Sequence, residues 1–269
     1  MIELFERDII EDKRRSSKGN QLKWSNGIYW YKADYTGYEG LSEYVCSSLL
    51  KYSNIPPEDY AIYDTEQINY KGNIFSGCKS RNFLPDGWEL VTLERLFKNA
   101  FSQSLYESIY KIHGIKDRAM FLTEQIERVT GLSDFGKYLS RLLTLDALFL
   151  NEDRHTHNIA LLRDGAGRYH YCPIFDNGGA LLSDIKMDYP IGMDIYELIE
   201  SCHSKTLSGD FMEQLDAVEE LYGQDVSFNF GYNELKDILD KELYYEKEFK
   251  KRAADIIMEQ RRKLGYLFE

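Results

Sequence analysis

Three oxygen-bearing side chains in the second half of the sequence could move a proton and hold a divalent cation. Asp153 and Asn158 lie in one polar segment, and Asp176 follows a short apolar run. A carboxylate can accept or orient the proton of an attacking hydroxyl group. Carboxylate and amide oxygens also suit Mg²⁺, which phosphoryl transfer needs in order to bridge the phosphates and neutralise their charge. The three residues therefore favour phosphoryl-transfer chemistry.

The spacing of Asp153 and Asn158 is that of the protein-kinase catalytic loop, Asp-x-x-x-x-Asn. An apolar helical pattern precedes this loop and a short apolar strand pattern follows it, an arrangement that holds reactive groups on a rigid scaffold. Within the loop we expect His155 to be a buried support of the loop backbone, and His157 to face solvent or to pack. The alternative interpretation is a solvated acidic loop followed by an unrelated turn aspartate at Asp176.

Zinc binding is a competing interpretation of the same region. His155, His157, His170 and Cys172 carry atoms that zinc accepts. No second pair of ligands stands at the spacing of a zinc finger, so the sequence disfavours this interpretation.

A kinase also needs a lysine for the nucleotide phosphates and an acid that holds this lysine. Lys32 ends a predicted strand, and two-residue alternation places it on the same face as Ile28 and Trp30. Glu43 lies on the next predicted helix and could pair with Lys32. Glu39, one helical turn earlier, is the alternative partner. The competing interpretation makes Lys32 a surface lysine and Glu43 an exposed helix acid.

The segment before the first predicted hairpin could bind phosphate. Ser16, Ser17, Lys18 and Gly19 lie in a polar stretch whose backbone N–H groups could bind phosphate oxygens. The stretch holds a single glycine, so the alternative is a terminal loop that binds nothing.

The order of predicted elements divides the chain into two lobes. In the first third we predict strands at 21–24, 28–33, 60–63 and 73–76, a turn at Ser25–Gly27, and one helix at 41–52. Later we predict helices at 89–100, 104–113, 117–130, 134–150, 195–203, 211–222, 233–243 and 247–264, with a hairpin at 159–172. We therefore expect an α+β, bilobal, protein-kinase-like fold. Its small mixed β-rich N-terminal lobe would occupy residues 1–84, and its larger, mainly helical C-terminal lobe residues 85–269.

Composition excludes several classes of function. The chain has 269 residues and a net charge of −12, which disfavours a broad nucleic-acid or anionic-membrane surface. No apolar run is long enough to span a membrane, and acids occupy the N-terminus where a signal peptide has basic residues. The four cysteines form no Cys-x-x-Cys pair, so we expect reduced thiols and a cytoplasmic protein.

Four segments together resemble the HipA-like serine/threonine kinases of bacterial toxin–antitoxin systems. They are Ser16–Lys23, Tyr31–Lys32, Leu41–Cys46, and Asn151–Asn158 with Phe175–Asp176. The resemblance implies a protein serine/threonine kinase that uses ATP and Mg²⁺, with Asp153 as the catalytic base and Asn158 and Asp176 as the magnesium ligands. It also implies that Lys32 anchors the phosphates, and that Lys79 and Ser80 lie near the hinge that covers the adenine.

The same resemblance implies self-phosphorylation at Ser16 or Ser17, and a toxin role with a small antitoxin protein as partner. Few residues precede Ser16, so we expect a compact form without the N-terminal subdomain of full-length members. The segment Asp153–Ile159 is also similar to the Asp-Arg-His-x-x-Asn-Ile of phosphoinositide kinases. Two alternatives therefore remain: a small-molecule or lipid kinase on the same scaffold, and a catalytically silent binding module.

Overall fold

The computed structural model describes residues 1–10 and 21–268. The chain forms two compact units. Unit 1 comprises Met1–Phe83, Phe175–Cys202 and Ser227–Glu269, and unit 2 comprises Leu84–Ile174 and His203–Val226. Unit 1 is followed by unit 2 at Leu84, close to the predicted lobe boundary, but two later segments of the chain belong to unit 1 again. The division into lobes at residues 84 and 85 stays a prediction.

Unit 1 contains a five-stranded sheet with the strand order β1-β4-β5-β3-β2. Its strands are β1 (Ile2–Leu4), β2 (Lys23–Ser25), β3 (Tyr29–Ala33), β4 (Tyr63–Tyr70) and β5 (Asn73–Arg81). β1 runs parallel to β4, and the other pairs are antiparallel. The predicted turn joins β2 to β3: Asn26 Oδ1 accepts hydrogen bonds from two following backbone N–H groups, and Gly27 has a φ of 86°. Only glycine adopts this φ without strain.

The chain that follows β1 joins the two edges of this sheet. Ile9 bridges to Trp24 in β2, and the Ile10 N–H donates to the Lys23 carbonyl at 3.0 Å. One face of the joined sheet thereby encloses a small hydrophobic core, formed by Leu4, Trp24, Tyr31, Ala33 and Ile68. Joining the edges leaves little unpaired strand backbone open to other chains.

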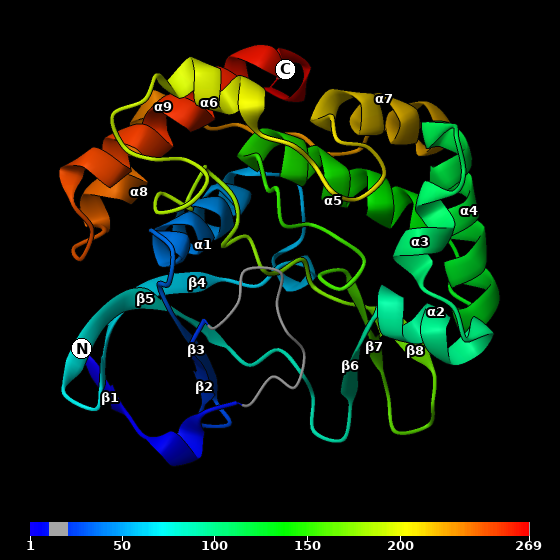
Figure 1. The fold of residues 1–269 in the computed structure, drawn as a ribbon, viewed down its shortest axis with the longest axis horizontal. Helices are drawn as coiled ribbons and strands as arrows, with labels where there is room; N and C mark the ends of the chain where they lie inside the picture. The colour runs from blue at the N-terminus through cyan, green and yellow to red at the C-terminus, as the bar shows by residue number, and fades with distance from the viewer. Residues whose placement is uncertain (11–20, 269) are drawn as a thin grey trace. The chain divides into compact units, whose positions relative to one another are not determined.

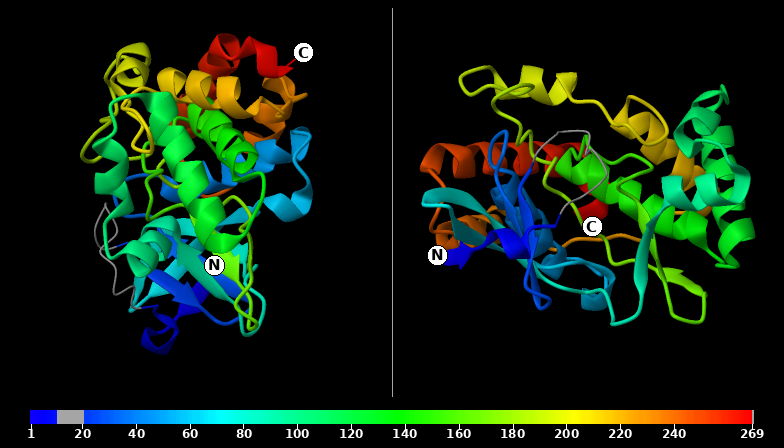
Figure 2. Two further views of the ribbon diagram at one scale, coloured as in Figure 1. Left: turned by 90° about the vertical axis from the view of Figure 1, so that its right-hand side faces the viewer. Right: turned by 60° about the horizontal axis from the view of Figure 1, so that its bottom comes forward.

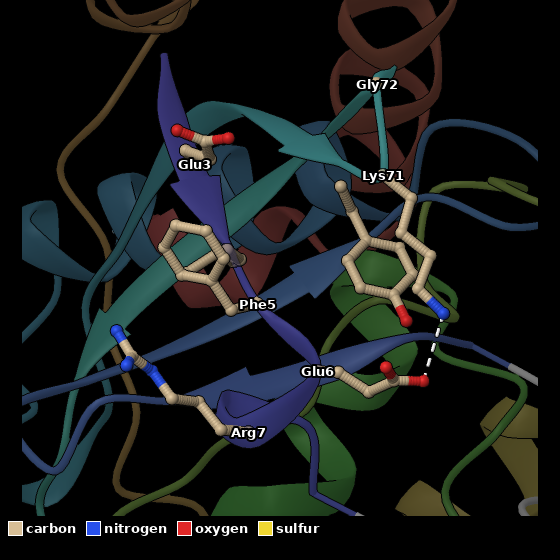
Figure 3. A pocket seen from close by; sticks show the side chains of 8 residues that line it. Glu3, Phe5, Glu6, Arg7, Lys71 and Gly72 are labelled. Carbon is tan, nitrogen blue, oxygen red and sulfur yellow. Dashed lines mark hydrogen bonds and ion pairs between the residues drawn. The ribbon is translucent and has the colours of Figure 1, made fainter.

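A cavity of about 740 Å³ opens beside the turn between β4 and β5 (Figure 3). It is lined by Glu3, Leu4, Phe5, Glu6, Arg7, Tyr70, Lys71 and Gly72. Lys71 Nζ lies 3.0 Å from Glu6 Oε1 across it. The strand register places Lys32 beside Cys78, far along β5 from this turn, so the cavity is separate from the predicted nucleotide-binding residues.

Helices cover the other face of the sheet (Figure 1). α1 (Glu39–Leu49) packs on β4 and β5, and α8 (Tyr232–Lys241) and α9 (Lys247–Lys263) pack on α1. α6 (Ile195–Ser201) contacts α9. Short 3-10 helices complete the list: η1 (Glu6–Asp8), η2 (Leu50–Tyr52), η3 (Pro57–Asp59) and η4 (Gly265–Phe268).

Unit 2 is mainly helical. It comprises α2 (Leu93–Phe101), α3 (Leu105–Tyr110), α4 (Ile115–Thr130), α5 (Phe135–Phe149) and α7 (Phe211–Tyr222), with a sheet of β6 (Glu89–Thr92), β7 (Ala160–Arg163) and β8 (Tyr169–Tyr171). α4, α5 and α7 pack against one another, and the helical part of the chain is seen from two further sides in Figure 2. A Cβ atom at Gly136 would lie 2.3 Å from the Tyr222 ring, so glycine permits the close approach of α5 to Tyr222.

The predicted order, a mixed sheet with one helix followed by mainly helical residues, is confirmed, whereas several predicted bounds differ from the structure. The predicted helix at 89–100 begins as strand β6, because Glu89–Thr92 pairs with β7 and Thr92 then caps α2 by accepting from the Arg95 N–H. The strand predicted at 60–63 is instead β4, Tyr63–Tyr70. β1 was missed, since three residues give too little pattern. Among the described residues, no helix is both long and apolar enough to cross a membrane.

Candidate active site

A largely buried lysine in unit 1 contacts two carboxylates. Lys32 Nζ lies 2.6 Å from Glu43 Oε1 and 2.7 Å from Asp176 Oδ1, and the lysine side chain is 14% exposed. Burial alone would lower the pKa of Lys32, but the carboxylates of Asp176 and Glu43 raise it well above its usual value. The lysine is therefore a fixed cation held between an acid of α1 and the acid that sequence analysis assigns to magnesium.

The structure distinguishes the two candidate partners of Lys32. Glu43 lies near the middle of α1 and is fully buried against the sheet. Glu39 instead turns back on the loop before α1, where its carboxylate accepts hydrogen bonds from the Thr36 N–H at 2.7 Å and from the Thr36 hydroxyl at 2.8 Å. The predicted Lys32–Glu43 pair is present, while the roles of both residues in nucleotide binding stay predictions.

The loop that begins at Asp176 is fixed to α1 by hydrogen bonds. The Asn177 N–H donates to Glu43 Oε2 at 2.8 Å, and the Ser42 hydroxyl contacts the carbonyls of Asn177 and Ala180 at 2.8 and 2.9 Å. Asp176 itself has a φ of 65°, a conformation that costs a non-glycine residue free energy. The contacts with Lys32 and α1 hold Asp176 in this conformation.

An apolar cluster in unit 1 lies beside Lys32. The Tyr63 ring centroid is 5.4 Å from Lys32 Nζ, and Tyr63 packs with buried Ala61 and Cys78. The rings of Phe83 and Phe175, 5.6 Å apart, pack against this cluster. This cluster packs against the fixed cation through the Tyr63 ring.

The two predicted hinge residues lie on opposite faces of β5. Ser80 is buried and pairs in register with Trp30 and Tyr63, on the face that carries Lys32. Lys79 points to the other face, where its Nζ contacts Glu66 Oε2 at 3.0 Å. The strand alternation therefore brings Ser80, but not Lys79, to the side of the sheet that carries Lys32.

The predicted catalytic loop lies in unit 2 and is organised by its own side chains. Asn158 Nδ2 donates to the Asp153 carbonyl at 2.8 Å and to Asp153 Oδ2 at 3.1 Å. This orientation turns the amide oxygen of Asn158 away from Asp153. Asn158 thus presents its amide nitrogen, and not its amide oxygen, to Asp153.

His155 lies inside this loop. Its Nδ1 accepts from the His157 N–H at 3.2 Å, and its carbonyl accepts from the Asn158 N–H at 2.7 Å. Burial lowers the pKa of His155, against the opposing charge of Asp153. The neutral imidazole then carries its proton on Nε2, which lies 3.8 Å from Asp153 Oδ1. These contacts agree with a role for His155 in supporting the loop.

A buried ion pair ties the loop to α5. Arg154 Nε lies 3.1 Å from Asp146 Oδ1, and both side chains are almost completely buried. Arg154 Nη1 also donates to the Asn158 carbonyl at 3.2 Å, while the Thr206 hydroxyl donates to the Arg154 carbonyl at 2.6 Å. Arg154 therefore fixes both ends of the segment from Asp153 to Asn158.

Glu94 is a supporting residue that sequence reasoning missed. From α2, its carboxylate accepts from the Thr156 hydroxyl at 2.8 Å and from the N–H groups of Leu105 and Tyr106 at 3.1 and 3.0 Å. It thereby links the middle of the loop to the start of α3. A single acid within a predicted helix gave no signal of this role, because its partners lie in two other segments.

Ser16, Ser17, Lys18 and Gly19 lie outside the described residues, so their predicted role in phosphate binding stays a prediction. No group of three or more His, Cys, Asp or Glu side chains within residues 1–10 and 21–268 could hold a metal ion. His170 contacts Asp164, and Cys172 is a buried free thiol.

Comparison with known proteins identifies the type of fold. No protein-family model and no curated protein matches the chain. Among solved structures, it is similar to CtkA, a proinflammatory kinase of Helicobacter pylori, with a TM-score of 0.58 and 17% sequence identity. The match covers 97% of this chain and 94% of that one. The chain therefore has a kinase-like fold, a mixed N-terminal sheet followed by a mainly helical region, as the sequence predicts.

Proposed function

We propose that the chain is an ATP- and Mg²⁺-dependent protein serine/threonine kinase of the HipA-like type. The observation that carries the proposal is the contact of the largely buried Lys32 with both Glu43 and Asp176. A lysine held by a helix acid beside a second, metal-binding acid is the phosphate-anchoring arrangement that kinases need. The kinase-like fold and the Asp153–Asn158 loop support the same conclusion.

In the proposed reaction the oxygen of a serine or threonine hydroxyl forms a bond to the γ-phosphorus of ATP. The bond from that phosphorus to the oxygen bridging the β- and γ-phosphates breaks, and ADP leaves. Asp153 accepts the hydroxyl proton, while Lys32 binds phosphate oxygens. Asn158 and Asp176 would hold magnesium, which neutralises phosphate charge when it is bound.

Transfer of labelled phosphate from ATP tests this function. The wild-type protein is compared with Lys32→Met and with Lys51→Met, which removes an exposed lysine of the same unit. We expect Lys32→Met to raise the KM for ATP by about 10- to 100-fold, because it removes a charged contact to phosphate. Lys51→Met should behave as wild type. A wild-type protein that transfers no phosphate to any acceptor would contradict the proposal.

The acceptor decides between the proposal and its alternative. A panel of protein acceptors, cationic metabolites such as aminoglycosides, and phosphoinositide vesicles is offered under the same conditions. The net charge of −12 would suit a cationic small acceptor, which keeps a small-molecule kinase as the second candidate. Phosphorylated serine or threonine in a protein acceptor supports the first proposal, and label confined to a metabolite or lipid supports the second.

Self-phosphorylation at Ser16 or Ser17 forms part of the proposal and rests on the sequence alone. A phosphate there adds nearly two negative charges to a segment proposed to bind ATP phosphates, so it should inhibit. We expect the intact mass of expressed wild-type protein to exceed the sequence mass by one phosphoryl group, and that of Asp153→Ala to equal it. An active wild-type protein without added mass would contradict this.

A toxin role would require that expression of the protein arrests growth only when Asp153 is present.

A further inference from the structure

Asp34, directly after β3, connects three parts of unit 1. Its backbone N–H donates to the Ser76 carbonyl of β5 at 2.8 Å. Its Oδ1 accepts from the Gly40 N–H in the first turn of α1, and its Oδ2 accepts from the Tyr245 hydroxyl, each at 2.7 Å. One carboxyl group thus joins the strand that carries Lys32, the helix that carries Glu43, and the segment between α8 and α9.

The packing around Asp34 leaves no room for α1 to move closer to the sheet. A Cβ atom at Gly40 would lie 2.4 Å from the Tyr245 hydroxyl and 2.5 Å from the Gly77 carbonyl carbon. A Cβ atom at Gly77 would lie 2.1 Å from the Lys32 carbonyl oxygen. The helix and the strands therefore touch backbone to backbone, and the Tyr245 hydroxyl fills the position where other residues at Gly40 would carry a side chain.

The segment between α8 and α9 holds Tyr245 in place. The buried Glu242 carboxylate accepts from the Tyr245 N–H at 3.0 Å and contacts Lys250 Nζ at 3.0 Å. Tyr245 is itself buried, and its hydroxyl is also 3.4 Å from the Gly77 carbonyl oxygen. Its orientation is therefore set by the C-terminal helices and not by α1 alone.

We propose that Tyr245 and Asp34 position α1 and thereby set the Lys32–Glu43 pair for nucleotide binding. Lys32 precedes Asp34 by two residues on β3, and Glu43 follows Gly40 by three residues, about one helical turn, on α1. A displacement of the first turn of α1 therefore moves Glu43 relative to Lys32. Tyr245 is buried, and in this proposal it is a positioning residue that acts through Asp34 and α1. This inference rests on the proposed nucleotide-binding role of Lys32.

The test compares Tyr245→Phe with Tyr244→Phe, which removes a hydroxyl from the neighbouring, partly exposed tyrosine. Hydrogen exchange of the α1 amides is measured without nucleotide, and the Kd of a fluorescent ADP analogue with Mg²⁺ is measured separately. For Tyr245→Phe we expect faster exchange at Gly40 and about tenfold weaker binding, because the Asp34 carboxyl group loses a buried hydrogen-bond donor. In turnover, the KM for ATP should rise more than kcat falls.

The outcomes separate this inference from the proposed function. Faster α1 exchange with weaker analogue binding in Tyr245→Phe alone supports both. A wild-type protein that binds no analogue contradicts the proposed function, and α1 exchange then still reports whether Asp34 and Tyr245 position the helix. Exchange and Kd that are unchanged in Tyr245→Phe overturn the inference. A loss of kcat at constant KM also overturns the inference. A partly unfolded protein would show this pattern without any change in nucleotide binding.

The carboxyl group of Asp34 also predicts a pH dependence of stability. Burial raises the pKa of Asp34 to about 8, and the charge of Glu39 acts in the same direction. The other titratable groups that face it are Tyr245, Lys186 and Cys78. Because an unfolded aspartate has a pKa of about 3.9, the folded chain holds a proton that the unfolded chain has lost between about pH 4 and pH 8.

The contribution of Asp34 to the free energy of unfolding should therefore be complete below about pH 4 and be lost as the pH rises to about 8. Urea unfolding of wild type and Asp34→Asn at pH 6 and pH 8.5 measures this. We expect wild type to lose more stability between the two values than Asp34→Asn, which cannot titrate at this position. Equal losses in the two proteins would contradict the assigned pKa shift.

Discussion

Replacing Asp153 by asparagine is expected to lower kcat by about 10²- to 10⁴-fold, the usual contribution of a positioned general base. The KM for ATP should change little, because the nucleotide contacts proposed for Lys32 and Asp176 are retained. Asparagine keeps the size of the side chain and an oxygen that can accept from Asn158 Nδ2. The loss of rate would then report proton transfer and not collapse of the loop.

The matched control is Asp216→Asn, which removes an exposed carboxylate from α7 in the same unit. Rates are measured by transfer of labelled phosphate at saturating ATP, with unfolding curves to verify that each variant is folded. The control should keep wild-type kcat. If Asp153→Asn retained wild-type kcat as well, Asp153 would not be the base, although the kinase assignment could survive with another group in that role.

Local sequence patterns predicted the candidate site where its geometry is local. The five-residue separation of Asp153 and Asn158 lies within one loop, so the spacing alone brings the two side chains within hydrogen-bond distance. Two-residue alternation placed Lys32 on one face of β3, and helical spacing offered Glu43 or Glu39 as partner. The sequence could not choose between these acids, because the choice depends on how α1 rests on the sheet at Gly40 and Gly77.

Contacts between distant segments could not be predicted. Tyr245 and Asp34 lie 211 positions apart, and neither belongs to a motif. Glu94 supports the loop from a helix whose sequence reveals only amphipathic character. Lys79 shows the same limit: the resemblance placed it with Ser80 near the hinge, whereas alternation along β5 puts Lys79 on the face opposite Lys32. The position of a residue within the strand, and not its type, decides on which face of the sheet its side chain lies.

The buried pair of Arg154 and Asp146 is expected to have the largest effect on stability. Replacing Arg154 by methionine keeps most of the side-chain volume but removes the guanidinium from beside a carboxylate that is only 1% exposed. Leaving one partner of a buried pair without the other typically costs about 3–5 kcal/mol of the free energy of unfolding. The loss also removes a donor from the Asn158 carbonyl, so the loop should loosen together with the helix.

An exposed ion pair on the same helix serves as the control. Lys137 and Asp134 lie 3.0 Å apart near the start of α5, and both side chains are more than 60% exposed. Because solvent screens such a pair, Lys137→Met should leave the urea midpoint unchanged. The double variant Asp146→Leu with Arg154→Met should be less destabilised than the sum of its single variants, since replacing both charges removes the cost of burying either one alone. Additive losses in this cycle would mean that the two side chains stabilise the loop independently, through contacts with other groups and not with each other.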